Sequence, residues 1–211
     1  MKKLLTIAML LLTVVACKEE NNPLNKLKEV TDKAKEVKQG LGNINEMVKE
    51  AEDLQENVEK LAELTPVSKE IIKAWMPTEL DNLKRTKYGI GKQMGFAQVS
   101  NLSLEFKEDD TYKKVDVSIT DGAGNGASFI SVFIMVQNAD IDSEDQTGYE
   151  RTETFDGQKI LVKYSNPEYN NRSQFNYLIN NRLLVEAKGW QMEPEELWVY
   201  LKKLEIEKLI E

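Results

Sequence analysis

The sequence contains no histidine and a single cysteine, Cys17, among its 211 residues. The lack of histidine excludes Ser-His-Asp and Cys-His catalysis and removes the commonest ligand of zinc and iron. The single thiol leaves no partner for an intramolecular disulfide or a CxxC metal site. The carboxylates Glu105, Glu153 and Glu186 show no spacing that pairs them for acid–base work. We therefore predict a protein that is not an enzyme and needs no cofactor or metal.

Long apolar runs are scarce as well. The run from Leu4 to Val15 follows two lysines and is too short to span a bilayer, which takes about 20 residues. It ends in Val14-Val15-Ala16-Cys17, which resembles the lipobox of bacterial lipoproteins. The resemblance implies a signal peptide over residues 1–16, a diacylglycerol on the Cys17 thiol and acylation of the new amine, for example with palmitate. The alternative is an ordinary signal peptide followed by an incidental cysteine.

The residues after the cysteine form a charged tether over 17–23. Lys18, Glu19 and Glu20 resemble the export signal that sends Bacteroidota lipoproteins to the outer face of the outer membrane. The resemblance implies a protein anchored to the outer membrane by lipid and displayed on the cell surface. A generic charged tether, which would leave the protein on the periplasmic leaflet, is the alternative. Two or three acyl chains would hold the protein stably, because one chain alone binds only marginally.

The charge balance of the chain is acidic. Residues 1–16 contain two lysines and no acidic residue, so the remainder carries 26 basic and 36 acidic residues. Such an excess of negative charge opposes binding to nucleic acid or to an anionic membrane surface through bulk charge. The lipid is therefore the expected contact with the membrane.

Residues 24–65 predict an amphipathic helical stalk. Its apolar residues recur at alternating spacings of three and four, as in a coiled coil. A continuous helix would reach about 60 Å at 1.5 Å per residue, and it can act as a spacer or an oligomerising element. Glycines at 40 and 42 favour a two-helix hairpin as the alternative. The apolar positions are Leu27, Val30, Ala34, Val37, Leu41, Ile44, Val48, Ala51, Val58 and Ala62.

The remaining residues, 66–211, predict one globular domain. Apolar and polar residues alternate over Leu102–Phe106 and Val115–Ile119, as in half-buried strands. The apolar run Ala127–Ala139 predicts a buried helix, although a core strand over Phe129–Val136 fits equally well. Strands on either side of Asp156-Gly157 predict a hairpin.

A second hairpin is predicted across Asn180-Asn181, and a C-terminal helix begins near Pro194. The expected order is β-β-α-β-β-β-β-α. Tight turns between successive strands favour a mostly antiparallel sheet with helices packed on one or both faces, which is an α+β fold. By topology this arrangement is similar to the Mog1/PsbP-like fold.

Four short segments also resemble uncharacterised Bacteroidota outer-membrane and surface lipoproteins. That resemblance covers about two-thirds of the chain and implies no reaction, because a shared fold does not supply an activity. The segments are Met76-Pro77-Thr78-Glu79-Leu80, Leu83-Lys84-Arg85-Thr86, Val117-Ser118-Ile119-Thr120-Asp121-Gly122-Ala123-Gly124 and Gly148-Tyr149-Glu150-Arg151-Thr152.

The glycine-rich segment after the second strand is the first candidate site. Gly122, Gly124 and Gly126 can direct backbone N–H groups toward an anion or another ligand. The segment lacks the lysine and Ser/Thr of a P-loop, and its spacing differs from the dinucleotide fingerprint. A plain linker between strand and helix explains the same residues.

Charged and aromatic segments supply three further candidates. The basic residues Lys84 and Arg85, and the loop residues Tyr169 and Arg172, form a possible partner surface. The alternatives are an ordinary surface strand and an ordinary hairpin loop. An acidic group has alternating carboxylates but lacks the spacing of an EF-hand loop, so a solvated loop is favoured. That group comprises Asp140, Asp142, Glu144 and Asp145.

These observations predict a non-enzymatic, lipid-anchored envelope protein. Its globular part is expected to bind another protein or an envelope complex. The alternative function is a small-ligand or glycan-binding lipoprotein that uses a cleft near the turn Gly122–Gly126. A deep apolar pocket would favour the ligand, and a flat exposed apolar patch would favour the protein partner.

Overall fold

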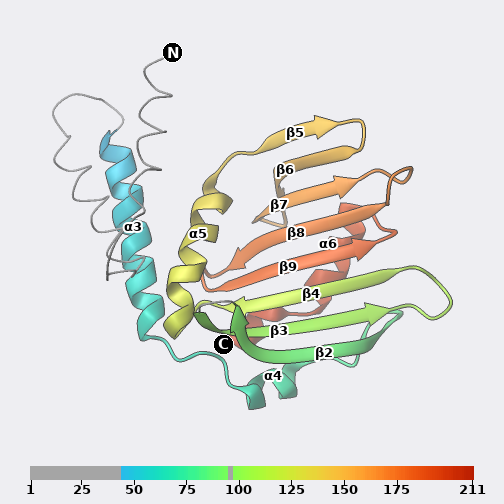
Figure 1. Ribbon diagram of the computed structural model, residues 1–211, viewed down its shortest axis with the longest axis horizontal. Coiled ribbons are helices and arrows are strands. Elements are labelled where there is room, and N and C mark those ends of the chain that lie inside the picture. Colours follow the sequence, from blue (N-terminus) through green and yellow to red (C-terminus); the bar gives the residue numbers. More distant parts are fainter. Residues whose placement is uncertain (1–43, 95–96) are drawn as a thin grey trace, which may run out of the picture. The chain divides into compact units, whose positions relative to one another are not determined.

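The structure is a computed structural model that describes residues 44–94 and 97–211 (Figure 1). The chain divides into two units, Met1–Val48 and Lys49–Glu211, and the second unit holds the sheet. The described residues form four α-helices and two short 3-10 helices. These are α3 (Ile44–Glu63), α4 (Lys69–Trp75), α5 (Ala127–Asn138), α6 (Pro194–Lys203), η1 (Gly124–Gly126) and η2 (Ile206–Leu209).

Nine strands form one sheet in the order β1-β2-β3-β4-β9-β8-β7-β6-β5, and every neighbouring pair is antiparallel. The sheet consists of two meanders, β1–β4 and β5–β9, which meet where β4 pairs with β9. Helix α5 carries the chain from the centre of the sheet to its far edge (Figure 1). The strands are β1 (Glu79–Leu80), β2 (Leu83–Met94), β3 (Ala97–Lys107), β4 (Lys114–Asp121), β5 (Asp142–Asp145), β6 (Gly148–Phe155), β7 (Gln158–Ser165), β8 (Arg172–Ile179) and β9 (Leu183–Trp190).

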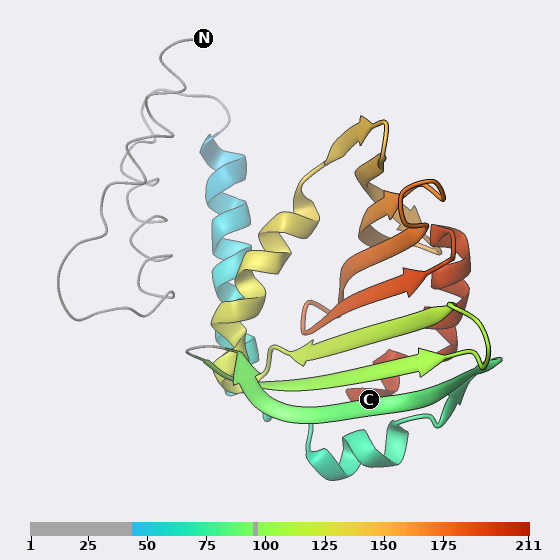
Figure 2. The same cartoon turned by 45° about the vertical axis from the view of Figure 1, so that its right-hand side comes forward.

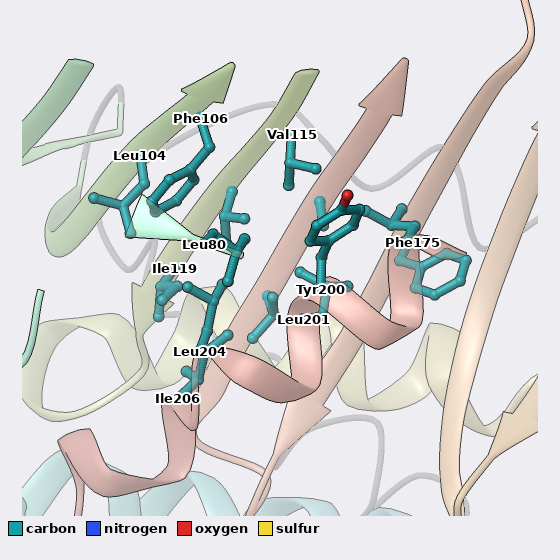
Figure 3. Close-up of a cluster of buried hydrophobic side chains, with 14 of the residues drawn as sticks. Leu80, Leu104, Phe106, Val115, Ile119, Phe175, Tyr200, Leu201, Leu204 and Ile206 are labelled. Atoms are coloured by element: carbon teal, nitrogen blue, oxygen red, sulfur yellow. The ribbon is translucent and has the colours of Figure 1, made fainter. Parts of the chain in front are cut away.

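One face of the sheet carries the main core, and we call it the closed face. Alternation along the strands sends every second side chain to this face, where Phe106 and Phe175 are completely buried. Leu201 and Leu204 of the α6 segment and Ile206 of η2 cover these residues (Figure 3). Burial of a large apolar side chain contributes about 1.5–3 kcal/mol, so this face supplies much of the stability of the fold.

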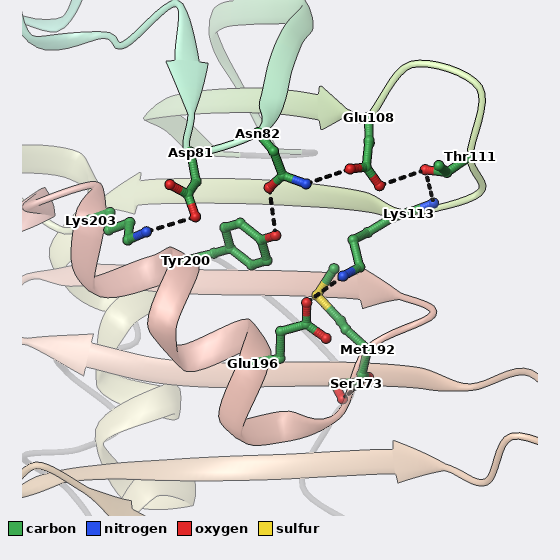
Figure 4. Close-up of polar contacts among 10 residues, drawn as sticks. All are labelled: Asp81, Asn82, Glu108, Thr111, Lys113, Ser173, Met192, Glu196, Tyr200 and Lys203. Carbon is green, nitrogen blue, oxygen red and sulfur yellow. Dashed lines mark hydrogen bonds and ion pairs between the residues drawn. The ribbon is translucent and has the colours of Figure 1, made fainter.

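Polar contacts fix α6 over the closed face. Pro194 occupies the first turn of this helix, as the sequence predicts. The Tyr200 hydroxyl donates a hydrogen bond to Oδ1 of Asn82 at 2.9 Å, and Lys203 pairs with Asp81 at 2.8 Å (Figure 4). These contacts tie the helix to the turn between β1 and β2. The helix therefore spans several strands of the sheet.

The opposite face is covered only in part by the described residues, and we call it the open face. Helix α5 packs over one end, where Leu161, Leu178 and Leu184 lie beneath Phe133. Gln137 of this helix donates a hydrogen bond to the Lys159 carbonyl at 2.9 Å. The far end of the open face, on β2, β3, β4 and β9, presents polar residues. Among the described helices, none is long and apolar enough to span a bilayer.

The expected fold class, an α+β domain of Mog1/PsbP type behind a long helical stalk, is wrong. The described chain is instead a nine-stranded antiparallel sheet with four helices that each have 20 residues or fewer. Of the stalk expected over residues 24–65, the structure describes the part from Ile44 onward, where α3 lies. The earlier part of the expected stalk, including the glycines at 40 and 42, lies outside the described residues.

The buried side of α3 also differs from the predicted apolar seam. Its buried residues are Leu54, Val58 and Leu61, spaced by four and three, whereas the seam residue Ala62 is exposed. Val58 belongs to the predicted seam, whereas Leu54 and Leu61 do not. The regular spacing in the sequence therefore predicted only part of the buried face of α3, because neighbouring stripes overlap on a short helix.

Three strands, β1, β2 and β5, were absent from the expected order of elements, although a surface strand was the alternative interpretation of the segment around Lys84 and Arg85. Strand β2 contains Gly89 and Gly91 among basic residues, a composition that disfavours strands, yet it pairs along β3. Register shifts within this pair accompany the strong bend of β2 (Figure 2). Strands β1 and β5 are short edge strands with little apolar signal. The predicted hairpins at Asp156-Gly157 and Asn180-Asn181 and the helix over Ala127–Asn138 are confirmed.

Candidate functional site

The glycine-rich turn after β4 is organised around the side chain of Asp121. This carboxylate accepts N–H groups from Val67 at 2.8 Å and from Ala123 at 3.0 Å. It also forms a two-point ion pair with Arg182 at 2.8 and 3.0 Å. Both side chains are largely buried, with 5% and 15% of their surface exposed. The anion held at this turn is thus the carboxylate of the chain itself.

Packing accounts for two of the three glycines. A Cβ at Gly122 would lie 2.4 Å from a side-chain carbon of Ile130, so the close approach of α5 requires glycine. Gly124 has a φ of 61° and lies beside Pro66, in the linker that leaves α3. Gly126 is buried and donates its N–H to the carbonyl of Ala123. These contacts explain the motif without a bound ligand.

Two residues of the predicted partner surface, Lys84 and Arg85, form local contacts at β2. Lys84 pairs with Asp109 at the exposed surface, and this contact raises the pKa of Lys84. Arg85 donates hydrogen bonds to the carbonyls of Met76 and Pro77 and lies over the ring of Tyr88, 5.3 Å from its centre. Both cations therefore have local structural contacts.

The other two residues of that surface lie elsewhere in the sheet. Tyr169 is exposed in the loop between β7 and β8, and Arg172 begins β8. Three strands separate β2 from β8, so the structure does not bring the four residues together as one patch. Arg172 pairs in register with Trp190, and its Nε is buried without a hydrogen-bond acceptor.

The acidic residues that follow α5 form an edge strand rather than the expected loop. Glu144, in β5, pairs with Arg151 of β6 at 2.9 Å. Asp145 accepts hydrogen bonds from the backbone and hydroxyl of Thr147, which hold the pKa of Asp145 below its usual value. Asp140 and Asp142 are exposed. In the part of the chain that the structure describes, no group of three or more acidic, histidine or cysteine residues is placed to bind a metal.

A row of charged residues crosses the uncovered end of the open face. Strand register places Lys87, Glu105, Asp116 and Lys188 side by side on β2, β3, β4 and β9. They line a shallow depression of about 300 Å³ together with Glu186 of β9 and two serines of the neighbouring row, Ser103 and Ser118. The sequence predicted the alternation of β3 and β4, but strand β2 and the order of the strands were needed to assemble this row.

Helix α5 presents an exposed apolar stripe. Val132, Met135 and Val136 are 59%, 62% and 39% exposed and follow the spacing of one helix face. No charged residue occurs in this helix. The sequence predicted a buried helix here, because a helix that is apolar all round is usually enclosed. The structure encloses only the side formed by residues such as Ile130 and Ile134.

The residues of the predicted lipidation and export signals, Cys17, Lys18, Glu19 and Glu20, lie outside the described residues. The lipid anchor and the surface location therefore remain predictions from the sequence. Comparison of the chain with known protein families, with curated proteins and with solved structures finds no match.

Proposed function

We propose that the protein is a non-enzymatic, lipid-anchored envelope protein whose folded part binds another protein through the exposed stripe of α5. The carrying observation is the exposure of Val132, Met135 and Val136 on a helix without charge. Exposed apolar side chains that lie together favour association, because contact with a partner removes them from water. No charge on this helix has to be desolvated when a partner binds.

The lipid anchor rests on the lipobox resemblance that ends at Cys17. Acyl chains on this residue would keep the folded part near the outer membrane, and the Lys18-Glu19-Glu20 signal favours the outer surface of the cell. A partner in the same envelope would then meet the stripe at a high effective concentration. A weak contact through three side chains can suffice under these conditions.

The alternative expectation, a ligand cleft beside the glycine turn, has less support. The Asp121 carboxylate accepts the N–H groups of Ala123 and of Val67, which lies in the linker after α3. Gly126 donates its N–H to the Ala123 carbonyl. This turn is therefore already satisfied within the protein. The apolar stripe is the better-supported contact surface for a protein partner.

A photo-crosslinking amino acid at position 135 of the full-length protein tests the proposal in intact cells. We expect one envelope protein to be captured at this position. The matched control places the same group at Val199 of α6, which is 47% exposed on a helix rich in charged residues. Equal capture at both positions, or no capture at 135, would contradict the role of α5.

The anchor is tested in the same cells. The Cys17→Ala variant is expected to leave the membrane fraction, and external proteinase is expected to digest the wild-type protein without lysis. Protection of the wild-type protein until the outer membrane is opened would place it on the periplasmic leaflet. Retention of the Cys17→Ala variant in the membrane would contradict lipid anchoring.

A further inference from the structure

The depression on the open face has free cations at its two ends. Lys87 on β2 and Lys188 on β9 line it, and neither forms an ion pair or a side-chain hydrogen bond with the described residues. Three strand spacings of about 4.8 Å place their backbones about 14 Å apart. An extended ligand that carries negative charge at separated points can therefore meet both ammonium groups.

Hydrogen-bond acceptors lie between these cations. Glu105 accepts the Thr86 hydroxyl at 2.6 Å and pairs with Lys107, and these contacts hold the pKa of its carboxyl below the usual value. Asp116 pairs with Lys114 through Oδ2 at 2.8 Å, while its Oδ1 is buried and has no hydrogen-bond donor among the described residues, so Asp116 helps to shape the floor of the depression.

Glu186 also has no ion-pair or hydrogen-bond partner among the described residues. The carboxylate of Glu186, on β9 two residues from Lys188, is therefore the acceptor that the depression offers to incoming hydroxyl groups. The serine hydroxyls of the neighbouring row can add further hydrogen bonds there.

The depression is open along its β2 side. Gly89 lies in register with Ser103, and Gly91 lies in register with Asn101. A Cβ at Gly91 would meet open space, and one at Gly89 would come within 2.9 Å of the Ser103 hydroxyl. The two glycines therefore keep side chains away from this side, and a chain-like ligand can enter from the sheet edge.

We propose that this depression binds an acidic oligosaccharide, with the carboxylates of uronate units at Lys87 and Lys188 and with a sugar hydroxyl donating to Glu186. An acidic peptide fits less well, because its many carboxylates would face those of the site without hydroxyls to offer them. A neutral glycan would leave the two lysines unused. The depression lies on β2, β3, β4 and β9, whereas the apolar stripe lies on α5. Binding of an oligosaccharide in the depression therefore does not depend on the proposed binding of a protein to α5.

The local charge balance allows such a ligand to approach. Four cations surround the depression (Lys87, Lys107, Lys114 and Lys188), and they face three acidic residues (Glu105, Asp116 and Glu186). The whole chain, by contrast, carries a net charge of −8. Attraction to the ligand is therefore local and short in range, and binding should weaken as salt is added.

Calorimetric titration of the purified protein, without its lipid, with oligogalacturonate tests the proposal. We expect saturable binding, no binding of the fully methyl-esterified oligomer, and about tenfold weaker binding by the double variant Lys87→Ala, Lys188→Ala. The control is Lys69→Ala, Lys73→Ala in α4, which removes the same charge from two exposed lysines. Equal weakening by both double variants, or no binding by the wild type, would overturn the proposal.

The variant Glu186→Met separates a sugar from a simple polyanion. If sugar hydroxyls donate to this carboxylate, loss of the acceptor weakens oligogalacturonate binding severalfold. If only charge matters, removal of a negative group strengthens binding instead, and the proposed hydroxyl contacts are wrong. Poly-glutamate serves as the peptide probe, and binding as tight as that of oligogalacturonate would identify the surface as a site for acidic protein.

Discussion

The two faces of the sheet are built from the same strands but differ in what they present. On β4, Val115, Val117 and Ile119 point to the closed face and are buried, whereas Asp116 and Ser118 point to the open face. The closed face is covered by α6 and η2 along most of its length. The open face is covered by α5 at one end (Figure 1). Its other end, on β2, β3, β4 and β9, presents polar side chains.

The difference separates stability from recognition. A shift of one residue in register would exchange the two faces, so the buried apolar set fixes the alignment of all the central strands. Once the alignment is fixed, side chains on the end of the open face that the described helices leave uncovered contribute little to stability and can vary with the ligand. Substitutions on the two faces should therefore have unequal effects on folding.

The largest expected effect comes from Phe106→Ala on the closed face. Phe106 is completely buried, so removing its ring loses apolar burial and leaves a cavity, at a cost of about 4 kcal/mol. The control is Ser103→Ala on the same strand, whose side chain faces the open side and should change stability by less than about 0.5 kcal/mol. Urea denaturation measures both, and equal losses would show that the two faces contribute alike.

A smaller loss of stability is expected when the buried ion pair between Asp121 and Arg182 is broken. Asp121→Ala leaves the guanidinium of Arg182 largely buried without its partner and frees the N–H groups of Val67 and Ala123. We expect a loss of about 3 kcal/mol.

The matched control for this pair is Asp109→Ala. It breaks the exposed pair with Lys84, whose side chain is 68% exposed, and should cost less than about 1 kcal/mol. Urea denaturation of the two variants compares the pairs directly. A loss for Asp121→Ala no larger than that for Asp109→Ala would show that burial adds nothing to this ion pair.

The smallest effect concerns pH at the edge of the closed face. Burial and the nearby Glu153 raise the pKa of Tyr149 from 10.0 to about 12. The folded state therefore holds this proton more tightly than the unfolded state. The resulting stability is fully present below about pH 10 and is lost as the pH rises toward 12.

Between about pH 9 and about pH 11, the Tyr149→Phe variant should lose less of its free energy of unfolding than the wild type. Urea denaturation of both proteins at each pH measures this loss. Tyr112→Phe is the control, because Tyr112 is 83% exposed. An equal alkaline loss in the wild type and in Tyr149→Phe would assign the effect to other groups.

The parts of the fold that the sequence predicted are those with a local signal. The hairpin at Asp156-Gly157 needs only turn residues between two alternating runs, and α6 has Pro194 and two acidic residues in its first turn. Strand β2 has no such signal, because Gly89 and Gly91 lower its strand propensity. It forms nevertheless, because pairing with β3 satisfies its backbone groups.

The candidate sites divide in the same way. The lipobox at Cys17 is a contiguous motif, so residues 14–17 suffice to predict it. The glycine turn was also contiguous, but its acceptor, Asp121, binds Arg182 in the turn between β8 and β9, 61 residues away. The row from Lys87 to Lys188 joins four strands and has no counterpart in the linear order of residues.

The sequence alone determined the acidic balance, the absence of histidine chemistry and the alternation that separates the two faces of the strands, and it predicted a lipobox. These properties depend on residue type and on spacings of a few residues. The tertiary structure decided which strands are neighbours, which side of α5 stays exposed and which charges remain unpaired. Those outcomes depend on contacts between residues far apart in the chain, and local propensity does not encode such contacts.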